Sequence, residues 1–265
     1  MSKEKDNNPR KKTGFKKAGA VIQARMSSSR LPGKVLADIE GKPMIVRLVE
    51  QVSHARLLDE IIVATSTDPS DDLLAETCDQ FGIACFRGDL ENVLERYISV
   101  AELKDLDVII RITGDNPFAD PILIDELLEM YAGDSQLDYI NNAHRDGSVA
   151  GSGAELVTRD ALHKADKLVD ASKDPKSYRE HVTLFIRLNT DCFNTRKFHP
   201  PKALSRSDIS YTVDYAEDLE LVRKIFNALQ RDHLPIKTSE IIHLLDKNPD
   251  LIKVNEKVKS KLPDF

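Results

Sequence analysis

Apolar residues along the chain occur in two alternating arrangements, short continuous runs and longer stretches with helical spacing. The run at 107–112 has an uninterrupted apolar centre, which is typical of a parallel strand covered on both faces. The stretch after Pro43 repeats apolar residues at helical spacing, with the proline in the first turn, where helices favour it. Strands are predicted at 21–24, 60–65, 83–86, 107–112, 137–140 and 209–213, and helices at 43–52, 73–78, 92–103, 121–128, 219–229 and 241–245.

This alternation of strand and helix predicts an α/β fold with a mostly parallel sheet and helices on both faces. From about Asn141 to Ser207 the rhythm changes, and the stretch is rich in charge, glycine and serine. We expect a disordered basic leader at 1–17, a domain at 18–235 with an inserted arm at about 141–207, and a C-terminal helical tail at 236–265.

Composition narrows the class of protein. The chain has 265 residues, 41% of them hydrophobic and 31% charged, which fits a soluble globular protein. A net charge of -6 argues against general attraction to nucleic acid or to an anionic membrane. No apolar run has the length of a membrane span, and the leader lacks the apolar core of a secretory signal. Three cysteines without paired spacing, Cys78, Cys85 and Cys192, predict buried thiols in a reducing cytoplasm.

A cationic loop follows the first predicted strand. Arg25, Arg30 and Lys34 lie there among three serines and a Pro-Gly pair. The carboxyl end of a strand is where an open α/β sheet binds its ligand, and these donors suit a polyphosphate. We therefore predict that these three residues bind phosphates and serve catalysis. The other nucleotide contacts predicted in this segment are Gln23, Ala24 and Ser29.

Two known phosphate-binding motifs do not fit. A P-loop needs glycine at position 28 and serine or threonine at position 35, but the chain has Ser28 and Val35. The dinucleotide fingerprint also fails, because Gly151-Ser-Gly153 continues to Leu156, where a third glycine or alanine belongs. The sequence therefore argues against a Walker-type ATPase and a dinucleotide-binding enzyme.

Two aspartates each follow a predicted strand. Asp115 comes directly after Gly114, just past the 107–112 strand, and Asp214 directly follows the 209–213 strand. Mg²⁺ that bridges phosphates is usually held by one or two carboxylates and water. We therefore predict that both bind magnesium and that Asp115 also contacts the nucleotide. Each has a structural alternative: Asp115 suits a turn, and Asp214 suits a helix N-cap with Glu217 three residues later.

Two further segments carry weaker signals. Arg87 and Gly88 are predicted to approach a base or ribose. On the helix that follows, Asn92 and Arg96 share a face and could contact a sugar or nucleotide, although packing and surface charge account for most of that helix. Within the arm, His181 lies among positively and negatively charged residues. These residues could bind an acceptor that is acidic or carries hydroxyl groups. The residues predicted to bind the acceptor are Glu155, Arg179 and His181.

These motifs, taken in order, resemble a known family. The segments are Ile22-Gln-Ala-Arg-Met-Ser-Ser-Ser-Arg-Leu-Pro-Gly-Lys34, Val63-Ala-Thr-Ser66, Phe86-Arg-Gly88, Val93-Leu-Glu-Arg-Tyr97, Arg111-Ile-Thr-Gly-Asp-Asn-Pro117, Arg179-Glu-His-Val-Thr183 and Tyr211-Thr-Val-Asp214. They look like the spore-coat polysaccharide cytidylyltransferase-like proteins (SpsF type), relatives of CMP-Kdo and CMP-sialate synthetases.

The resemblance implies a nucleotide-diphospho-sugar transferase fold of the GT-A-like, Rossmann-like type. It implies transfer of CMP from CTP to a sugar-like acceptor, with Mg²⁺ on Asp115 and Asp214 and phosphates on the three cations of the first loop. No nucleic acid or membrane partner is expected, and a homodimer is an expectation from the resemblance alone.

One departure leaves the acceptor and the activity open. The family often has a Gly-Leu-Asp-type segment before the glutamate of the arm, where this chain has Gly151-Ser-Gly-Ala-Glu155. Three alternatives remain: a glycosyltransferase of the same fold, another nucleotidyltransferase, and an inactive binding or scaffold protein. A glycosyltransferase would carry an Asp-x-Asp motif at a strand end, whereas Asp105-Leu-Asp107 precedes its strand.

Overall fold

The computed structural model describes residues 17–141, 149–229 and 234–259, so nearly all of the predicted leader lies outside the described residues. The strands are β1 Ala18–Gln23, β2 Asp38–Ile39, β3 Lys42–Pro43, β4 Glu60–Ser66, β5 Cys85–Gly88, β6 Val108–Thr113, β7 Tyr139–Asn141, β8 Glu155–Thr158 and β9 Thr195–Lys197. The α-helices are α1 Met44–Val52, α2 Asp72–Gln80, α3 Val93–Leu103, α4 Pro121–Gly133, α5 Arg159–Val169, α6 Pro175–Glu180, α7 Leu184–Leu188, α8 Ala216–Ala228, α9 Thr238–Lys247, α10 Pro249–Ile252 and α11 Glu256–Lys259.

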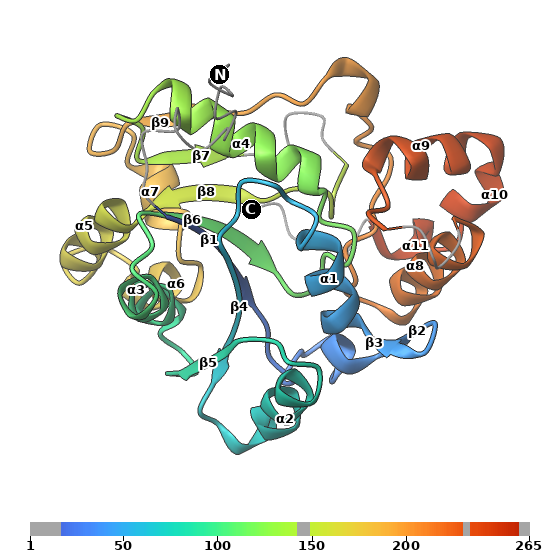
Figure 1. The fold of residues 1–265 in the computed structure, drawn as a ribbon, viewed down its shortest axis with the longest axis horizontal. Coiled ribbons are helices and arrows are strands. Elements are labelled where there is room, and N and C mark those ends of the chain that lie inside the picture. Colours follow the sequence, from blue (N-terminus) through green and yellow to red (C-terminus); the bar gives the residue numbers. More distant parts are fainter. Residues whose placement is uncertain (1–16, 142–148, 230–233, 260–265) are drawn as a thin grey trace, which may run out of the picture.

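A seven-stranded sheet in the order β5-β4-β1-β6-β8-β7-β9 runs through the middle of the molecule (Figure 1). β5, β4, β1 and β6 are mutually parallel, while β8 runs antiparallel to both of its neighbours. The chain builds outward from β1 through β4 to β5 and then returns to the other side of β1 with β6. This reversal opens a crevice between the carboxyl ends of β1 and β6, the usual ligand site of such sheets. The predicted α/β fold is confirmed.

Alternate strand residues explain the two covered faces. Ala20 and Ile22 of β1 pack into a core with α1, α2 and α4, whereas Val21 packs into a second core with α3, α5 and α7. Figure 1 shows α3 and α5 on one side of the sheet and α1 on the other. Continuous apolar runs therefore become strands because both of their faces are buried.

The C-terminal helices α8 and α9 supply much of a third core. Phe118, which follows β6, packs there with Tyr211, and α8 and α9 supply most of the remaining apolar side chains. In Figure 1 these helices group beside α1 and the β2–β3 hairpin. This packing fixes the segment before α8 next to the end of β6, and with it Asp214.

The predicted strand at 209–213 is wrong. Within this segment the structure has only an isolated bridge, between Ala150 and Ser210. Both edges of β6 are already occupied by β1 and β8, so the segment bonds to loops instead. The amide of Tyr211 donates to the Ala150 carbonyl over 3.0 Å, and the amide of Val213 donates to the Asp115 carbonyl over 2.8 Å.

The stretch predicted as an inserted arm, about 141–207, contributes to the main sheet. It supplies β8 and β9, and its helices α5 and α7 cover one face of that sheet. Residues 142–148 of this stretch lie outside the described residues.

The cysteines only partly match the prediction of buried thiols. Cys78 is buried, but Cys85 and Cys192 are exposed. In the described part of the chain, none of the helices combines the length and the apolar character needed to cross a bilayer.

Candidate active site

Backbone hydrogen bonds shape the loop after β1 into a cradle. The Met26 carbonyl accepts from the amides of Ser28 and Gly33, each over 2.9 Å, and Gly33 has a φ of 72°, which favours glycine. The Met26 amide donates to the buried carboxylate of Asp71 over 2.7 Å. Asp71 thus anchors the loop to the carboxyl end of β4.

The loop after β6 lies against the same cradle because Gly114 lacks a side chain. Its amide donates to the Gln23 carbonyl over 2.8 Å. A Cβ atom at Gly114 would lie 2.9 Å from the Cβ of Ala24 and 3.0 Å from the Gln23 carbonyl oxygen. This close approach places Asp115 beside the cationic loop.

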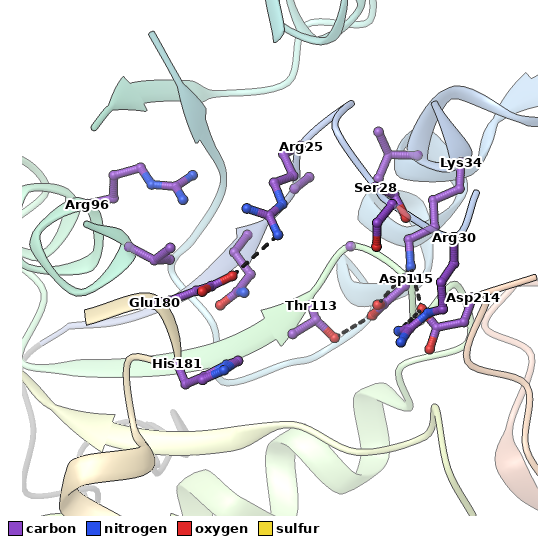
Figure 2. Close-up of a pocket in the computed structure, with 16 residues that line it drawn as sticks. Arg25, Ser28, Arg30, Lys34, Arg96, Thr113, Asp115, Glu180, His181 and Asp214 are labelled. Atoms are coloured by element: carbon purple, nitrogen blue, oxygen red, sulfur yellow. Dashed lines mark hydrogen bonds and ion pairs between the residues drawn. The ribbon is translucent and has the colours of Figure 1, made fainter. Parts of the chain in front are cut away.

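Four charged side chains, from these two loops and from the segment before α8, meet at the crevice, and we name them the Lys34 cluster: Arg30, Lys34, Asp115 and Asp214. The Lys34 ammonium lies 3.1 Å from Asp115 Oδ2, 2.9 Å from Asp214 Oδ1 and 2.6 Å from the Val213 carbonyl oxygen. The Arg30 guanidinium lies 2.7 Å from Asp214 Oδ1. Figure 2 shows the two aspartates pointing toward the same ammonium group. The structure therefore brings together the three chain segments from which the sequence predicted phosphate and metal binding.

The structural alternative for Asp214, a helix N-cap, does not hold. Asp218 Oδ2 accepts from the amides of Asp214 and Tyr215 over 3.0 and 2.9 Å, so Asp218 serves the start of α8. Burial by itself would raise the pKa of Asp214, but Lys34 and Arg30 outweigh it and lower that pKa. Its carboxylate is therefore ionised and faces the crevice.

The cluster lines one end of a cavity of about 390 Å³. Arg25 reaches across it, and its guanidinium lies 3.4 Å from Glu180 Oε1 (Figure 2). The predicted site residues that line this cavity are Gln23, Ala24, Arg25, Ser29, Arg30, Lys34, Asp115, His181 and Asp214.

A second cavity of about 400 Å³ adjoins the first. Both are lined by Gln23, Thr113, Asp115 and His181. The second cavity is also lined by Asn116, Asn141, Arg187 and Thr212. Two neighbouring cavities that share a wall are what a transfer reaction between two bound molecules needs.

Glu155 lines the second cavity at the centre of a saturated group, the Glu155 cluster: Arg111, Tyr139, Glu155 and Thr183. The carboxylate accepts from Arg111, from the Tyr139 hydroxyl and from the Thr183 hydroxyl, each over 2.7 Å. Burial by itself would raise the pKa of Glu155, but Arg111 and these hydrogen bonds lower it. Arg111 and Tyr139 lie on β6 and β7, the two strands that flank β8, so this carboxylate connects three neighbouring strands.

Three predicted site residues line neither cavity. Arg87 turns toward α2, where its guanidinium donates to the Ser66 carbonyl over 2.8 Å and to Asp72 over 2.6 Å. Arg179 lies 2.8 Å from both Asp166 and Asp170. Gly88 leaves room for the stem of Arg96, since a Cβ atom there would lie 2.6 Å from the Arg96 Cγ.

Comparison with known proteins identifies the family of the chain. The sequence profile of the cytidylyltransferases matches residues 20–242. The chain belongs to the cytidylyltransferase family. It is 34% identical over 235 residues to the spore coat polysaccharide biosynthesis protein SpsF of Bacillus subtilis, covering 87% of this chain and 94% of that protein.

Solved cytidylyltransferase structures share the fold. A cytidylyltransferase of Leptospira borgpetersenii superimposes with a TM-score of 0.82 at 26% identity, covering 89% of this chain and 96% of that one. The CMP-2-keto-3-deoxy-manno-octonic acid synthetase in complex with CTP superimposes with a TM-score of 0.63 at 23% identity, covering 81% and 100% of the two chains.

Sequence reasoning missed parts of this cytidylyltransferase site. Thr113 donates to Asp115 Oδ1 over 2.6 Å, and its place directly before the Gly-Asp pair was an available signal. Asp71 had no such signal, because Asp68-Pro-Ser-Asp71 reads as a helix start. Arg96, which the sequence offered only as a possible sugar or nucleotide contact, lines the first cavity.

The donor set of the Lys34 cluster suits a hard cation. The carboxylates of Asp115 and Asp214 both lie next to the Lys34 ammonium, so the space between them already favours a positive charge. Among residues 17–141, 149–229 and 234–259, no group of three or more His, Cys, Asp or Glu side chains could hold a metal alone. A metal that binds through two carboxylates would need phosphate oxygens and water as well, which is how Mg²⁺ usually binds in nucleotide sites.

Proposed function

We propose that the protein transfers a cytidylyl group from CTP to a sugar-like acceptor in the biosynthesis of a surface polysaccharide. The observation that carries the proposal is the convergence of Arg30, Lys34, Asp115 and Asp214 at the crevice between β1 and β6. Membership of the cytidylyltransferase family supports CTP as the donor. The name of the SpsF relative supports the polysaccharide context.

In the proposed reaction an acceptor hydroxyl in the second cavity attacks the α-phosphorus of CTP in the first. The bond between the α-phosphorus and the bridging oxygen breaks, pyrophosphate leaves, and the hydroxyl proton is released to water. Arg30 and Lys34 would stabilise the negative charge on the phosphate oxygens, since fixed cations act strongly in a site partly shielded from water. Gln23, Thr113 and His181, on the shared wall, would position the two reactants.

Asp115 and Asp214 would hold Mg²⁺ together with phosphate oxygens. The ion would neutralise charge on the triphosphate and orient the leaving group.

A pyrophosphate-release assay tests the proposal. CTP, UTP, GTP and ATP are each incubated with the protein, Mg²⁺ and a panel of neutral and acidic sugars. The proposal predicts release with CTP and at least one sugar, and release should depend on both. Absence of release with every pair, together with absence of CTP binding, would contradict it.

A further inference from the structure

His181 lies where the two cavities meet. It follows the last residue of α6 and lines both cavities, together with Gln23, Thr113 and Asp115. Figure 2 shows its ring pointing into the first cavity, toward Thr113. If CTP occupies the first cavity and the acceptor occupies the second, the atoms that react lie at this shared wall.

Two of the other side chains on the shared wall are held in hydrogen bonds that suit positioning. Gln23 Oε1 accepts from the Arg111 guanidinium over 3.1 Å. The Thr113 hydroxyl donates to Asp115 Oδ1 over 2.6 Å and accepts from the Asn116 amide over 2.8 Å. An amide and an alcohol do not take up a proton near neutral pH, so neither group can serve as a base.

In the described part of the chain, each carboxylate that lines either cavity lies against a cation. The pairs are Asp115 with Lys34, Asp214 with Lys34, Glu155 with Arg111, and Glu180 with Arg25. A neighbouring positive charge favours the ionised form of a carboxylate and makes it a weaker base. Imidazole changes its protonation state near neutral pH, which is what a general base requires. On the shared wall, this chemistry belongs to His181.

The backbone next to His181 has a strained conformation. Val182 has a φ of 43°, in the left-handed region that β-branched residues rarely adopt, and its side chain is fully buried in the second core. Such strain persists where the surrounding structure fixes it, and it concentrates at functional sites. Here it lets three consecutive residues serve different places: His181 the cavities, Val182 the core, and Thr183 the Glu155 carboxylate.

Other charged groups surround His181. Besides the Lys34 cluster, those that line the two cavities are Arg25, Arg96, Glu180, Arg111, Glu155 and Arg187. These groups also affect how turnover depends on pH. A change at His181 alone is therefore needed to identify its share.

We propose that His181 is the general base of the transfer reaction and accepts the proton of the acceptor hydroxyl. The O–H bond breaks while the hydroxyl oxygen forms its bond to the α-phosphorus of CTP, and pyrophosphate leaves with the electron pair of the bond that breaks. The imidazolium then gives its proton to water, which regenerates the neutral ring. The inference rests on the proposed function and adds to it the group through which the hydroxyl proton leaves.

The pH dependence of turnover in His181→Gln tests this. Glutamine keeps a hydrogen-bond donor and an acceptor but has no titratable nitrogen. Pyrophosphate release is measured between about pH 5 and pH 8 with CTP and an acceptor found in the sugar panel. The wild-type kcat should rise with pH and level off as the imidazole loses its proton. His181→Gln should lower kcat about 10²-fold or more, and the rise with pH should disappear. CTP affinity, measured by calorimetry, should stay that of the wild type.

Added imidazole provides a second test. Imidazole in solution should restore part of the kcat of His181→Gly, because the free base can enter the space that the side chain leaves. A residue with a purely structural role would show no such rescue. His163→Gln is the matched control, because His163 lies on α5 and lines neither cavity. Its kcat and pH profile should equal those of the wild type.

Three results for His181→Gln would overturn the inference. A wild-type kcat with the same rise with pH would do so and leave the proposed function intact. A higher KM for the acceptor at an unchanged kcat would indicate a contact that only binds the acceptor, and loss of CTP binding would indicate a role in the donor site or in folding. Absence of pyrophosphate release by the wild type with every sugar would overturn the proposed function as well.

Discussion

The Lys34 cluster and the Glu155 cluster both pair carboxylates with cations near β6, yet they differ in where their members come from. The Glu155 cluster takes its hydrogen-bond donors from β6 and β7, the two strands that flank β8, and from Thr183 before α7. The Lys34 cluster is assembled from three loops at the carboxyl edge of the sheet. Its outer members are more open, with side-chain exposure of 37% for Arg30 and 24% for Asp115 against 15% for Arg111.

This difference separates a structural role from a functional one. Two donors on strands and one at the start of α7 hold the Glu155 carboxylate and connect three parts of the fold. Loop residues at an open crevice can exchange protein partners for a ligand. We therefore expect changes in the Lys34 cluster to affect turnover far more than stability, and changes in the Glu155 cluster to do the reverse.

The largest expected effect is on turnover. Asp115→Asn and Asp214→Asn should each reduce the rate of pyrophosphate release by about 10²–10³-fold or more, because each removes charge that orients the triphosphate. The melting temperature should change little. Turnover is measured with CTP and an acceptor found in the sugar panel, and melting by calorimetry. Wild-type turnover in either variant would remove that aspartate from the metal site.

Glu155→Gln should instead lower the free energy of unfolding by about 3 kcal/mol, because it leaves the buried Arg111 charge unpaired. Urea denaturation measures this loss. Affinity for CTP should stay close to that of the wild type. The double variant Glu155→Leu with Arg111→Met is the control, and it should recover part of the stability since no charge is left unpaired. A neutral effect of Glu155→Gln would contradict the structural role.

Gly114→Ala tests the backbone contact that places Asp115 in the Lys34 cluster. The added methyl group would press on Ala24 and on the Gln23 carbonyl, so the two loops must separate. We expect a loss of about 1–3 kcal/mol in stability together with weaker CTP binding. Gly133→Ala is the matched control, because a Cβ atom there would meet no atom within 4 Å. Equal behaviour of the two variants would argue against the close approach.

The smallest expected effect is on how the free energy of unfolding depends on pH. The pKa of Glu155 lies below its ordinary 4.5, and that of Asp214 below its ordinary 3.8. A lowered carboxylate pKa adds stability above the ordinary value, and this stability is lost as the pH falls through the folded-state pKa. The free energy of unfolding, measured between about pH 3 and pH 6, should therefore fall more steeply for the wild type than for Glu155→Gln. Parallel curves would contradict the lowered pKa of Glu155.

Much of the fold could be predicted because the strands β1, β4 and β6 are apolar runs buried on both faces. The strands β8 and β9 could not, since they have four and three residues and the latter, Thr195–Lys197, is polar. β9 lies at the sheet edge and pairs through its backbone with β7. Such short strands depend on tertiary pairing rather than on local pattern.

The residues of the candidate site could also be predicted only in part. Lys34, Asp115 and Asp214 could be predicted because each follows an apolar segment whose carboxyl end meets the others. Asp71 could not, because its role depends on a contact with Met26, which lies far from it in sequence. The strand assigned to 209–213 was wrong, yet Asp214 still reaches the crevice because Val213 bonds to the Asp115 carbonyl.

The proposed function requires that the Lys34 cluster bind one nucleoside triphosphate together with a divalent cation. The most direct test is the affinity of CTP, measured by calorimetry with and without Mg²⁺, for the wild type, Asp115→Asn and Asp214→Asn. We predict that Mg²⁺ tightens CTP binding to the wild type and that this gain disappears in both variants. The same Mg²⁺-dependent gain in the wild type and in both variants would contradict the account.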